Sequence, residues 1–343
     1  MNDSKTVSPG SKKAGGIAEF ISHNAIYAVL IFLIAIIAII NPSFLSLTSL
    51  RDILLQSSTR IIIALGALLI ILTGGCDLSA GRTVGLAAVV AASMLQAEDA
   101  GNLFFPNMNH HLPLFVPILI TMAVGVLVGL LNGWIVAKLD VPPFITTLGT
   151  MCIIYGANSI YFDLPPNNSQ PIGSLREDFT NLGSGTFLGI PFLLIIAIIS
   201  VIVIYVVLQK TRFGKNLYAI GGNREAANVS GINVRKCLLA VYIIAGIMYA
   251  LAGALESART GSATNNYGNG YELDAYAACI VGGCSVTGGV GTVPGIVVGV
   301  IIFSVINYGL TFVGVNPYWQ QIIKGAIIVL AVAVDIRKYL KNK

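Results

Sequence analysis

The stretch FLLIIAIISVIVIYVVL, residues 192–208, decides the fold of this chain. It contains no charged residue, and a similar run, AIYAVLIFLIAIIAII, occupies residues 25–40. A helix needs about 20 predominantly apolar residues to cross the roughly 30 Å hydrocarbon core of a bilayer. Such runs recur along a chain that is 55% hydrophobic and only 10% charged. A soluble domain of this size must cover its surface with charge, so we predict an all-α, polytopic membrane protein.

About ten transmembrane helices follow from these runs and from the turn residues between them. The polar residues 1–24 form an N-terminal tail without the features of a signal peptide, residues 25–335 form the membrane domain, and residues 336–343 form a C-terminal tail. The predicted helices cover approximately residues 25–40, 58–73, 79–97, 113–136, 143–162, 188–208, 237–256, 273–285, 291–310 and 318–335.

The basic residues are distributed unevenly between the two predicted sides. With an internal N-terminus, the inward segments carry 15 of the 20 Lys and Arg residues, the outward side and outer helix ends carry four, and Lys324 lies inside a span. An excess of Lys and Arg marks the cytoplasmic loops of a membrane protein. Both termini are therefore expected in the cytoplasm.

The longest internal cytoplasmic segment, residues 209–236, holds six of these basic residues. They could be topology determinants or contacts to anionic membrane lipid. Within it, Asn223 is a candidate helix N-cap, Glu225 suits the dipole of the first turn, and Gly231 is placed to stop the helix. A helix of two turns is too short to be stable alone in water. We therefore expect a docking element for a partner protein at residues 223–230.

The stretch LTGGCDLSAGR, residues 72–82, interrupts the membrane domain. The stretch from Arg60 to Thr73 has only 14 residues, about 21 Å of helix, so either this span begins earlier, near Ile53, or the break lies at membrane depth. Irregular backbone is tolerated there only where it lines protein or a cavity. Asp77 and Ser79 could cap the following helix or line a pathway, and Arg82 could pair with Asp77 or mark the cytoplasmic end of that helix.

A related string, GGCSVTGG at residues 282–289, resembles GGCDLSAG at residues 74–81. Both interrupt an apolar run, so we interpret them as two helix breaks with similar structural roles. Polar residues within spans usually face the protein interior, which adds further candidates for a polar pathway. These are Asn132, Thr146, Thr147, Tyr155, Asn158, Asn265, Asn266, Glu272 and Asp274. Thr146 and Thr147 could instead bond to their own helix, and Lys324 could snorkel or neutralise a buried carboxylate.

The five cysteines lie singly among apolar residues, and the pair His110-His111 lies in a polar loop. None has the spacing of a metal-ligand set, so we expect no metal site.

Several motifs resemble one family, the permeases of ABC (ATP-binding-cassette) importers. The pattern E-A-A-x-x-x-G, which runs from Glu225 through Ala226 and Ala227 to Gly231, resembles the coupling-helix signature of that family. Its monosaccharide branch, which includes galactose, ribose and xylose permeases, is also resembled by other stretches. They are RIIIALG (60–66), DLSAGRTVGLAAVVAA (77–92), PFITTLGTM (143–151), GSATNN (261–266) and VINYGLTFVGVNPYWQQIIKGAII (305–328).

This resemblance implies a translocation subunit in a bacterial inner membrane, with galactose or a methyl galactoside as its foremost substrate. It further implies a separate ATPase subunit that holds ATP and Mg, an extracytoplasmic sugar-binding protein and a second copy of the chain. No cofactor in this chain and no nucleic-acid partner are expected.

Two other functions compete with this interpretation. An ion-coupled secondary transporter would use acidic residues near the bilayer midplane, for which Asp77 and Asp274 are candidates. A membrane enzyme would need a catalytic constellation that the sequence does not show. The sequence also lacks G-x-x-x-x-G-K-[ST], the loop that cradles nucleotide phosphates, so energy from ATP has to arrive through a partner chain.

Overall fold

The computed structural model describes residues 25–108 and 112–341. The predicted tail 1–24, His110-His111 and residues 342–343 lie outside the described residues. In chain order the elements are α2 (Ala25–Ile40), η1 (Pro42–Leu45), α3 (Leu47–Leu72), α4 (Ala80–Met94), α5 (Phe115–Lys138), α6 (Pro143–Asp163), α7 (Glu177–Ser184), β1 (Thr186–Phe187), β2 (Ile190–Pro191), α8 (Phe192–Lys210), α9 (Arg212–Gly222), α10 (Arg224–Val229), α11 (Val234–Thr260), α12 (Tyr271–Val281), α13 (Val293–Phe312) and α14 (Pro317–Lys341).

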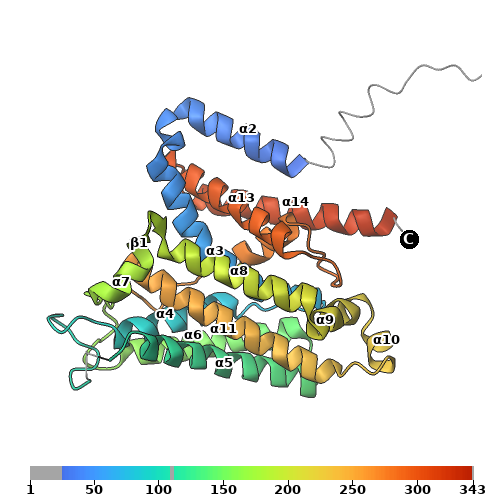
Figure 1. The fold of residues 1–343 in the computed structure, drawn as a ribbon, viewed down its shortest axis with the longest axis horizontal. Coiled ribbons are helices and arrows are strands. Elements are labelled where there is room, and N and C mark those ends of the chain that lie inside the picture. Colours follow the sequence, from blue (N-terminus) through green and yellow to red (C-terminus); the bar gives the residue numbers. More distant parts are fainter. Residues whose placement is uncertain (1–24, 109–111, 342–343) are drawn as a thin grey trace, which may run out of the picture.

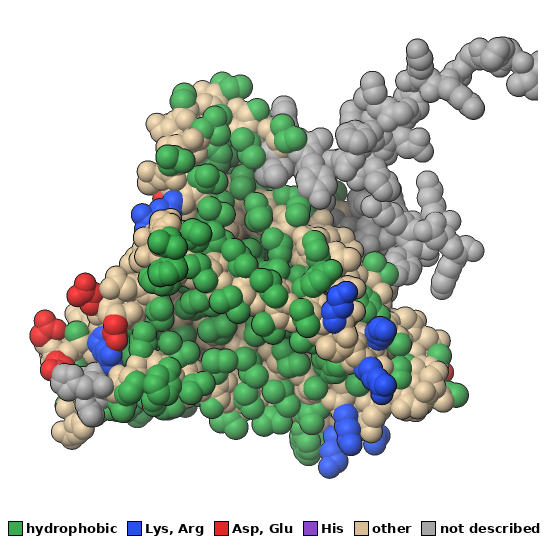
Figure 2. Space-filling view, viewed as in Figure 1, with side chains coloured by type: hydrophobic (Ala, Val, Ile, Leu, Met, Phe, Trp, Pro, Cys, Tyr) green, Lys and Arg blue, Asp and Glu red, His purple; other side chains and the backbone are tan. Residues whose placement is uncertain are grey.

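Several long helices, among them α5, α8, α11 and α14, run roughly along the longest axis of the molecule, whereas α3 crosses them at a steep angle (Figure 1). The short helices α9 and α10 lie at one end of this bundle, and α7 and β1 lie at the other. Hydrophobic side chains cover the middle of the visible face, whereas most of its Lys and Arg side chains gather at the end where α9 and α10 lie (Figure 2). This is the surface of a bundle that crosses an apolar layer.

Two helices, α3 and α11, form the centre of the bundle. The residues from Ile62 to Leu72 at the end of α3 are buried on every side, which is how a helix that is apolar all round behaves in a protein interior. Helix α3 packs against α8, α11, α12 and α13, whereas α11 packs against α3, α4, α5 and α7. By contrast, α5 and α8 expose large apolar residues such as Leu127 and Ile199, as helices facing lipid do.

The contact between α5 and α11 is made by backbone against backbone. A Cβ atom built on Gly125 would overlap the carbonyl oxygen of Gly246, and one built on Gly129 would overlap that of Tyr242. Two glycines four residues apart let membrane helices approach closely, because packing rather than the hydrophobic effect holds helices together in lipid. The α5–α11 pair therefore depends on these missing side chains.

Each predicted helix overlaps a helix of the structure, but several boundaries were wrong. Helix α3 begins at Leu47 rather than residue 58, because the Ser46 side chain accepts the N–H of Ser49 (3.2 Å) and caps the helix. The predicted span 188–208 begins only at Phe192. Residues 186–191 form a hairpin there, with left-handed backbone at Leu188 (φ 51°) and Gly189 (φ 81°).

The all-helical prediction holds for the described residues, in which this hairpin is the one sheet. Five of the described helices, α3, α5, α8, α11 and α13, have the length and apolar composition that a membrane crossing requires. Helix α4, with 15 residues, and α12, with 11, are shorter. These two short helices adjoin the breaks at residues 73–79 and 282–292.

We predict that Gly129→Ala destabilises the bundle by about 1–3 kcal/mol, because the added methyl group has to push α5 away from α11. The control is Gly156→Ala in α6, where a Cβ atom meets nothing within 4 Å. That variant should be neutral or slightly stabilising, since Ala is the better helix former. Thermal unfolding in detergent measures both. Equal midpoints for the two variants would show that the close contact does not hold the pair together.

Candidate functional site

Helix α10 has a complete cap at each end. The side chain of Asn223 accepts the N–H of Ala226 (2.9 Å) at its start. At its end Gly231 has a left-handed backbone (φ 84°). The N–H groups of Gly231 and Ile232 donate to carbonyl groups three and five residues earlier, both at 3.0–3.1 Å. This is a Schellman motif, so the predicted docking helix exists as a fixed local structure.

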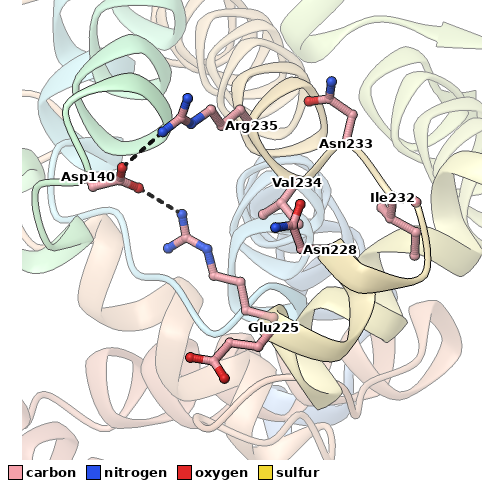
Figure 3. Close-up of a pocket in the computed structure, with 9 residues that line it drawn as sticks. Asp140, Glu225, Asn228, Ile232, Asn233, Val234 and Arg235 are labelled. Atoms are coloured by element: carbon pink, nitrogen blue, oxygen red, sulfur yellow. Dashed lines mark hydrogen bonds and ion pairs between the residues drawn. The ribbon is translucent and has the colours of Figure 1, made fainter.

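The two sides of α10 differ in exposure. Ala227 is buried against the rest of the protein, whereas the Val229 side chain is 89% exposed. Glu225 lies in the first turn and lines a wide, open hollow of about 790 Å³ beside the helix (Figure 3). An exposed apolar residue and an exposed carboxylate on one short helix suit a contact with another protein.

The loop between α5 and α6 holds α10 from the side of this hollow. Asp140 in that loop accepts from Arg224 (3.1 Å) and from Arg235 (3.4 Å) (Figure 3). The three side chains are about half exposed or more, so each ion pair contributes little to stability. Their role is to orient α10 relative to α5 and α11.

The two helix breaks have the same structure, and they touch. Helices α3 and α12 are both followed by a glycine in left-handed conformation, Gly74 (φ 74°) and Gly283 (φ 87°). In both, the next N–H group donates to a carbonyl five residues earlier, so both breaks are Schellman motifs. The N–H of Gly289 in the second break donates to the carbonyl of Leu72 in the first (3.0 Å). The prediction of similar structural roles is confirmed.

Helix α9 completes this contact. Gly221, near its end, lies directly against Leu72 and Gly289, and the Tyr218 hydroxyl group donates to the carbonyl of Gly291 (2.9 Å). Burial raises the pKa of the Tyr218 phenol, which keeps this donor protonated. We call the meeting point of α9 with the two breaks the glycine junction.

A buried polar cluster follows the first break. Asp77 accepts from the backbone N–H of Ser79 (2.9 Å) and from its hydroxyl group, and Asn132 of α5 donates to that hydroxyl group (2.8 Å). The next backbone N–H after Asp77 donates to the hydroxyl group of Thr147 in α6 (3.1 Å). Tyr276 of α12 accepts the N–H of Asp77 itself. The cluster therefore ties α4, α5, α6 and α12 together.

A second polar group lies where α4 and α6 meet the loop before α12. Arg82 donates to Asn269 (2.9 Å), and its guanidinium carbon lies 4.3 Å from the ring centre of Tyr155. Of the two sequence-based alternatives for Arg82, the pairing with Asp77 is therefore wrong, whereas its place at the cytoplasmic end of a helix stays a prediction. Arg82 lies in the first turn of α4 and beside the loop that the sequence placed on the outer side.

Two asparagines join α6 to the same loop. Asn158 donates to the carbonyl of Asn265 (3.4 Å), whose own side chain donates to Ser159 (3.2 Å). Asn266 is exposed. Some buried side-chain atoms among the described residues have no hydrogen-bond partner. They include the hydroxyl oxygen of Thr146 and the amide oxygens of Asn132 and Asn158.

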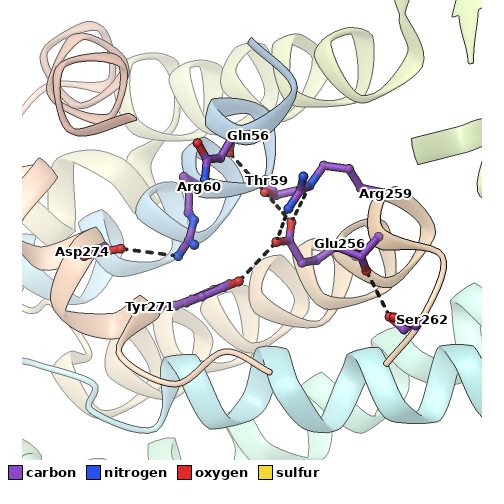
Figure 4. A network of polar contacts seen from close by, with 9 residues as sticks. Gln56, Thr59, Arg60, Glu256, Arg259, Ser262, Tyr271 and Asp274 are labelled. Atoms are coloured by element: carbon purple, nitrogen blue, oxygen red, sulfur yellow. Dashed lines mark hydrogen bonds and ion pairs between the residues drawn. The ribbon is translucent and has the colours of Figure 1, made fainter. Parts of the chain in front are cut away.

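An ion network joins α3, α11, α12 and α14 (Figure 4). Glu256, which is 2% exposed, accepts from Thr59 (2.9 Å), Arg259 (2.8 Å) and Tyr271 (3.2 Å). The guanidinium carbon of Arg60 lies 3.3 Å from the ring centre of Tyr271. A buried carboxylate is stable only with partners of this kind.

Asp274 belongs to the same network. It forms ion pairs with Arg60 (3.7 Å) and Lys324 (3.2 Å). Of the two alternatives for Lys324, neutralisation of a buried carboxylate is therefore the one that the structure supports.

The comparisons with known proteins identify the family. The family described as "Branched-chain amino acid transport system / permease component" matches residues 49–332. The chain belongs to this permease family.

Several relatives of the permease are similar over nearly their whole length. The galactose/methyl galactoside import permease protein MglC of Escherichia coli (strain K12) is 55% identical over 328 residues, 94% of this chain and 97% of the relative. MglC of Haemophilus influenzae is 53% identical over 95% of this chain and 97% of its own. The ribose import permease protein RbsC of E. coli (strain K12) is 38% identical over 90% and 92%. No solved structure matches the permease.

The predicted pathway residues of the permease fall into three groups. Asp77, Ser79, Asn132 and Thr147 meet in one cluster, with the buried Thr146 next to Thr147 in α6. Tyr155 and Asn158 of α6 lie near the loop that holds Asn265 and Asn266. Asp274 instead belongs to the ion network, which sequence reasoning missed. The signal for that network was Glu256 and Arg259, an acid and a base three residues apart in an apolar helix.

We predict that Asp77→Asn in the permease leaves the free energy of unfolding nearly unchanged, because the amide oxygen can still accept from Ser79. The rate of sugar uptake should stay within about threefold of that of the unchanged chain. Asp77→Ala removes the acceptor and should cost about 1–2 kcal/mol of stability. Thermal unfolding and uptake of radiolabelled sugar by cells measure the two effects. Loss of uptake in a well-folded Asp77→Asn variant would contradict this assignment and would indicate that the negative charge itself takes part in transport.

Proposed function

We propose that the chain is the membrane-spanning subunit of an ATP-driven importer of a monosaccharide, with galactose or a methyl galactoside as its cargo. The observation that carries this proposal is the 53–55% identity, over about 95% of the chain, to permeases named for galactose and methyl galactoside. The 38% identity to ribose permeases supports a sugar as the substrate class. Because this identity is lower than the identity to the galactose permeases, it favours galactose over ribose. Glucose is a further candidate sugar of the same size.

In this proposal the chain lies in a bacterial inner membrane with about ten crossings and with both termini in the cytoplasm. The tails are residues 1–24 and 336–343, and the permease domain is residues 25–335 with the coupling loop 209–236. The gathering of Lys and Arg at the end of α9 and α10 (Figure 2) supports this orientation, since basic residues mark the cytoplasmic side. These basic side chains would also contact anionic lipid.

The energy for transport enters through α10 in this proposal. A separate ATPase subunit holds ATP and Mg and binds the exposed side of α10, where Glu225 and Val229 lie. The helix is short, and it is fixed at both ends by Asn223 and by the turn at Gly231, so a push on it moves the attached segments as a body. Two copies of the chain form the pore, and an extracytoplasmic binding protein delivers the sugar.

A sugar carries many hydroxyl groups, and leaving them unpaired in hydrocarbon is costly. The polar residues along α4, α6 and the loop before α12 supply hydrogen-bonding groups for such a cargo. Tyr155, Asn158, Asn265 and the exposed Asn266 are the candidates on this side. Buried oxygens that lack a partner, as on Asn158, are capable of accepting from a sugar hydroxyl group when the helices move apart.

The competing ion-coupled mechanism finds little support in the acidic residues. Glu256 and Asp274 are each paired with at least one basic side chain, and Asp77 is engaged with Ser79. A coupling carboxylate has to exchange its ion or proton during transport, whereas Glu256 and Asp274 join helices and Asp77 caps its own segment.

Uptake with the complete importer tests the cargo. In cells that lack other galactose transporters, the chain, its ATPase and the binding protein should restore uptake of radiolabelled galactose. Unlabelled galactose and methyl galactoside should compete, and ribose should compete at least about tenfold less, as a loss of matched hydrogen bonds allows. Ribose competing as well as galactose would contradict the assigned cargo.

We predict that Glu225→Lys and Gly231→Val each reduce uptake by at least about tenfold, a typical effect of losing a charged or well-packed contact at an interface. The matched control is Gly231→Asn, since asparagine tolerates the left-handed backbone that strains valine. Membrane insertion is checked by immunoblot, and binding of the ATPase by co-purification. Normal uptake in Glu225→Lys and Gly231→Val would refute α10 as the entry point of energy.

A further inference from the structure

We propose that Gly221 is a positioning residue of the importer, through which α9 moves both helix breaks together. The inference rests on the proposed function and deepens it, because it names the contact by which movement of α10 reaches the polar cluster. Four features of the described residues carry it.

The first feature is the rigid link between α10 and α9. A single residue, Asn223, ends α9 and begins α10. Its N–H donates to Ala219 of α9 (3.0 Å), while its side chain caps α10 by accepting from Ala226. With no free linker between the two helices, a displacement of α10 is passed to α9.

The second feature is that no side chain separates α9 from the breaks at Gly221. A Cβ atom built on Gly221 would overlap the carbonyl oxygen of Leu72 and the backbone nitrogen of Gly289. Those two atoms lie in the first and second breaks, and the N–H of Gly289 donates to the carbonyl of Leu72. Gly221 therefore meets both breaks at the point where they are bonded to each other. Contacts between backbones leave no flexible side chain to absorb a movement.

The third feature is a second attachment of α9 to the same break. Tyr218 lies three residues before Gly221 on α9, and its hydroxyl group donates to the carbonyl of Gly291 (2.9 Å). Helix α9 thus holds the segment 288–291 at two points. Two attachments fix orientation as well as position, so rotation of α9 has to move this segment.

The fourth feature is that both breaks lead directly to the buried polar cluster. From Leu72 the chain reaches Asp77 in five residues, and from the second break it returns along α12, about 9 Å of helix, to Tyr276. The two routes meet again, because Tyr276 accepts the N–H of Asp77. The glycine junction and the polar cluster are therefore connected by two routes, one through residues 72–77 and one through α12.

The test compares Gly221→Ala with its neighbour Gly222→Ala in liposomes that contain the complete importer with its ATPase and binding protein. A Cβ atom on Gly222 meets nothing within 4 Å, and alanine favours the helix at both positions. The measured quantity is the number of ATP molecules hydrolysed per sugar imported. We expect this ratio to rise about tenfold in Gly221→Ala, within the range by which coupling residues act, and to stay within about twofold in Gly222→Ala.

Tyr218→Phe provides a second, milder variant, since it removes one hydrogen bond and adds no atom. Its ratio of ATP to sugar should rise about threefold to fivefold, the value of one hydrogen bond. This variant decides the question if Gly221→Ala fails to insert or to bind the ATPase. The unchanged chain, which keeps this hydrogen bond, is the reference for both variants.

The results separate this inference from the proposed function. If the unchanged importer transports sugar but the ratio stays constant in Gly221→Ala, or in Tyr218→Phe where the first variant does not assemble, the role of Gly221 is refuted and the function stands. If the unchanged importer does not transport sugar on ATP, the proposed function fails. A ratio that rises in Gly221→Ala and not in Gly222→Ala supports both.

Discussion

The structure depends on one constraint, which is that the backbone of a membrane domain has to satisfy its own hydrogen bonds. The chain interrupts two helices, α3 and α12, and each interruption leaves carbonyl groups at the helix end without a partner inside the helix. Both ends solve the problem in the same way, with a left-handed glycine and a Schellman motif. The remaining carbonyl of Leu72 is satisfied by Gly289 of the other break. The two breaks therefore stabilise each other.

This contact between the two breaks explains how a separate ATPase chain could drive a permease that lacks a nucleotide-binding motif of its own. Helix α9 touches the breaks at one end of the bundle and is joined to α10 through Asn223, and the breaks continue into the polar cluster around Asp77. The ion network around Glu256 and Asp274 holds α12 against α3, α11 and α14. In the proposed mechanism, the network keeps the outer part of α12 fixed while its other end follows α9.

Much of the fold could be predicted from local sequence, because the signals lie within each segment. The apolar run at residues 192–208 and the cap residues Asn223 and Gly231 define their helices without reference to the rest of the chain. The alternative that α3 begins before residue 58, near Ile53, is confirmed, but its start at Leu47 was not predicted, since a serine cap followed by Arg51 and Asp52 does not look like a membrane helix. Contacts between distant segments, such as that of Gly221 with Leu72 and Gly289, could not be predicted. A glycine in the sequence allows another segment to approach closely, but it does not show which segment that is. The role of the pathway residues in sugar transport remains a prediction. For Asp274, the structure adds its ion pairs with Arg60 and Lys324.

The central claim is that this chain moves sugar only with work supplied by a separate ATPase. Purified protein reconstituted into liposomes, with radiolabelled galactose outside and an imposed proton or sodium gradient, tests it most directly. The chain alone should accumulate no sugar under any ion gradient, whereas addition of the ATPase, the binding protein and ATP should give accumulation against the concentration gradient. Accumulation by the chain alone under an ion gradient would contradict the account.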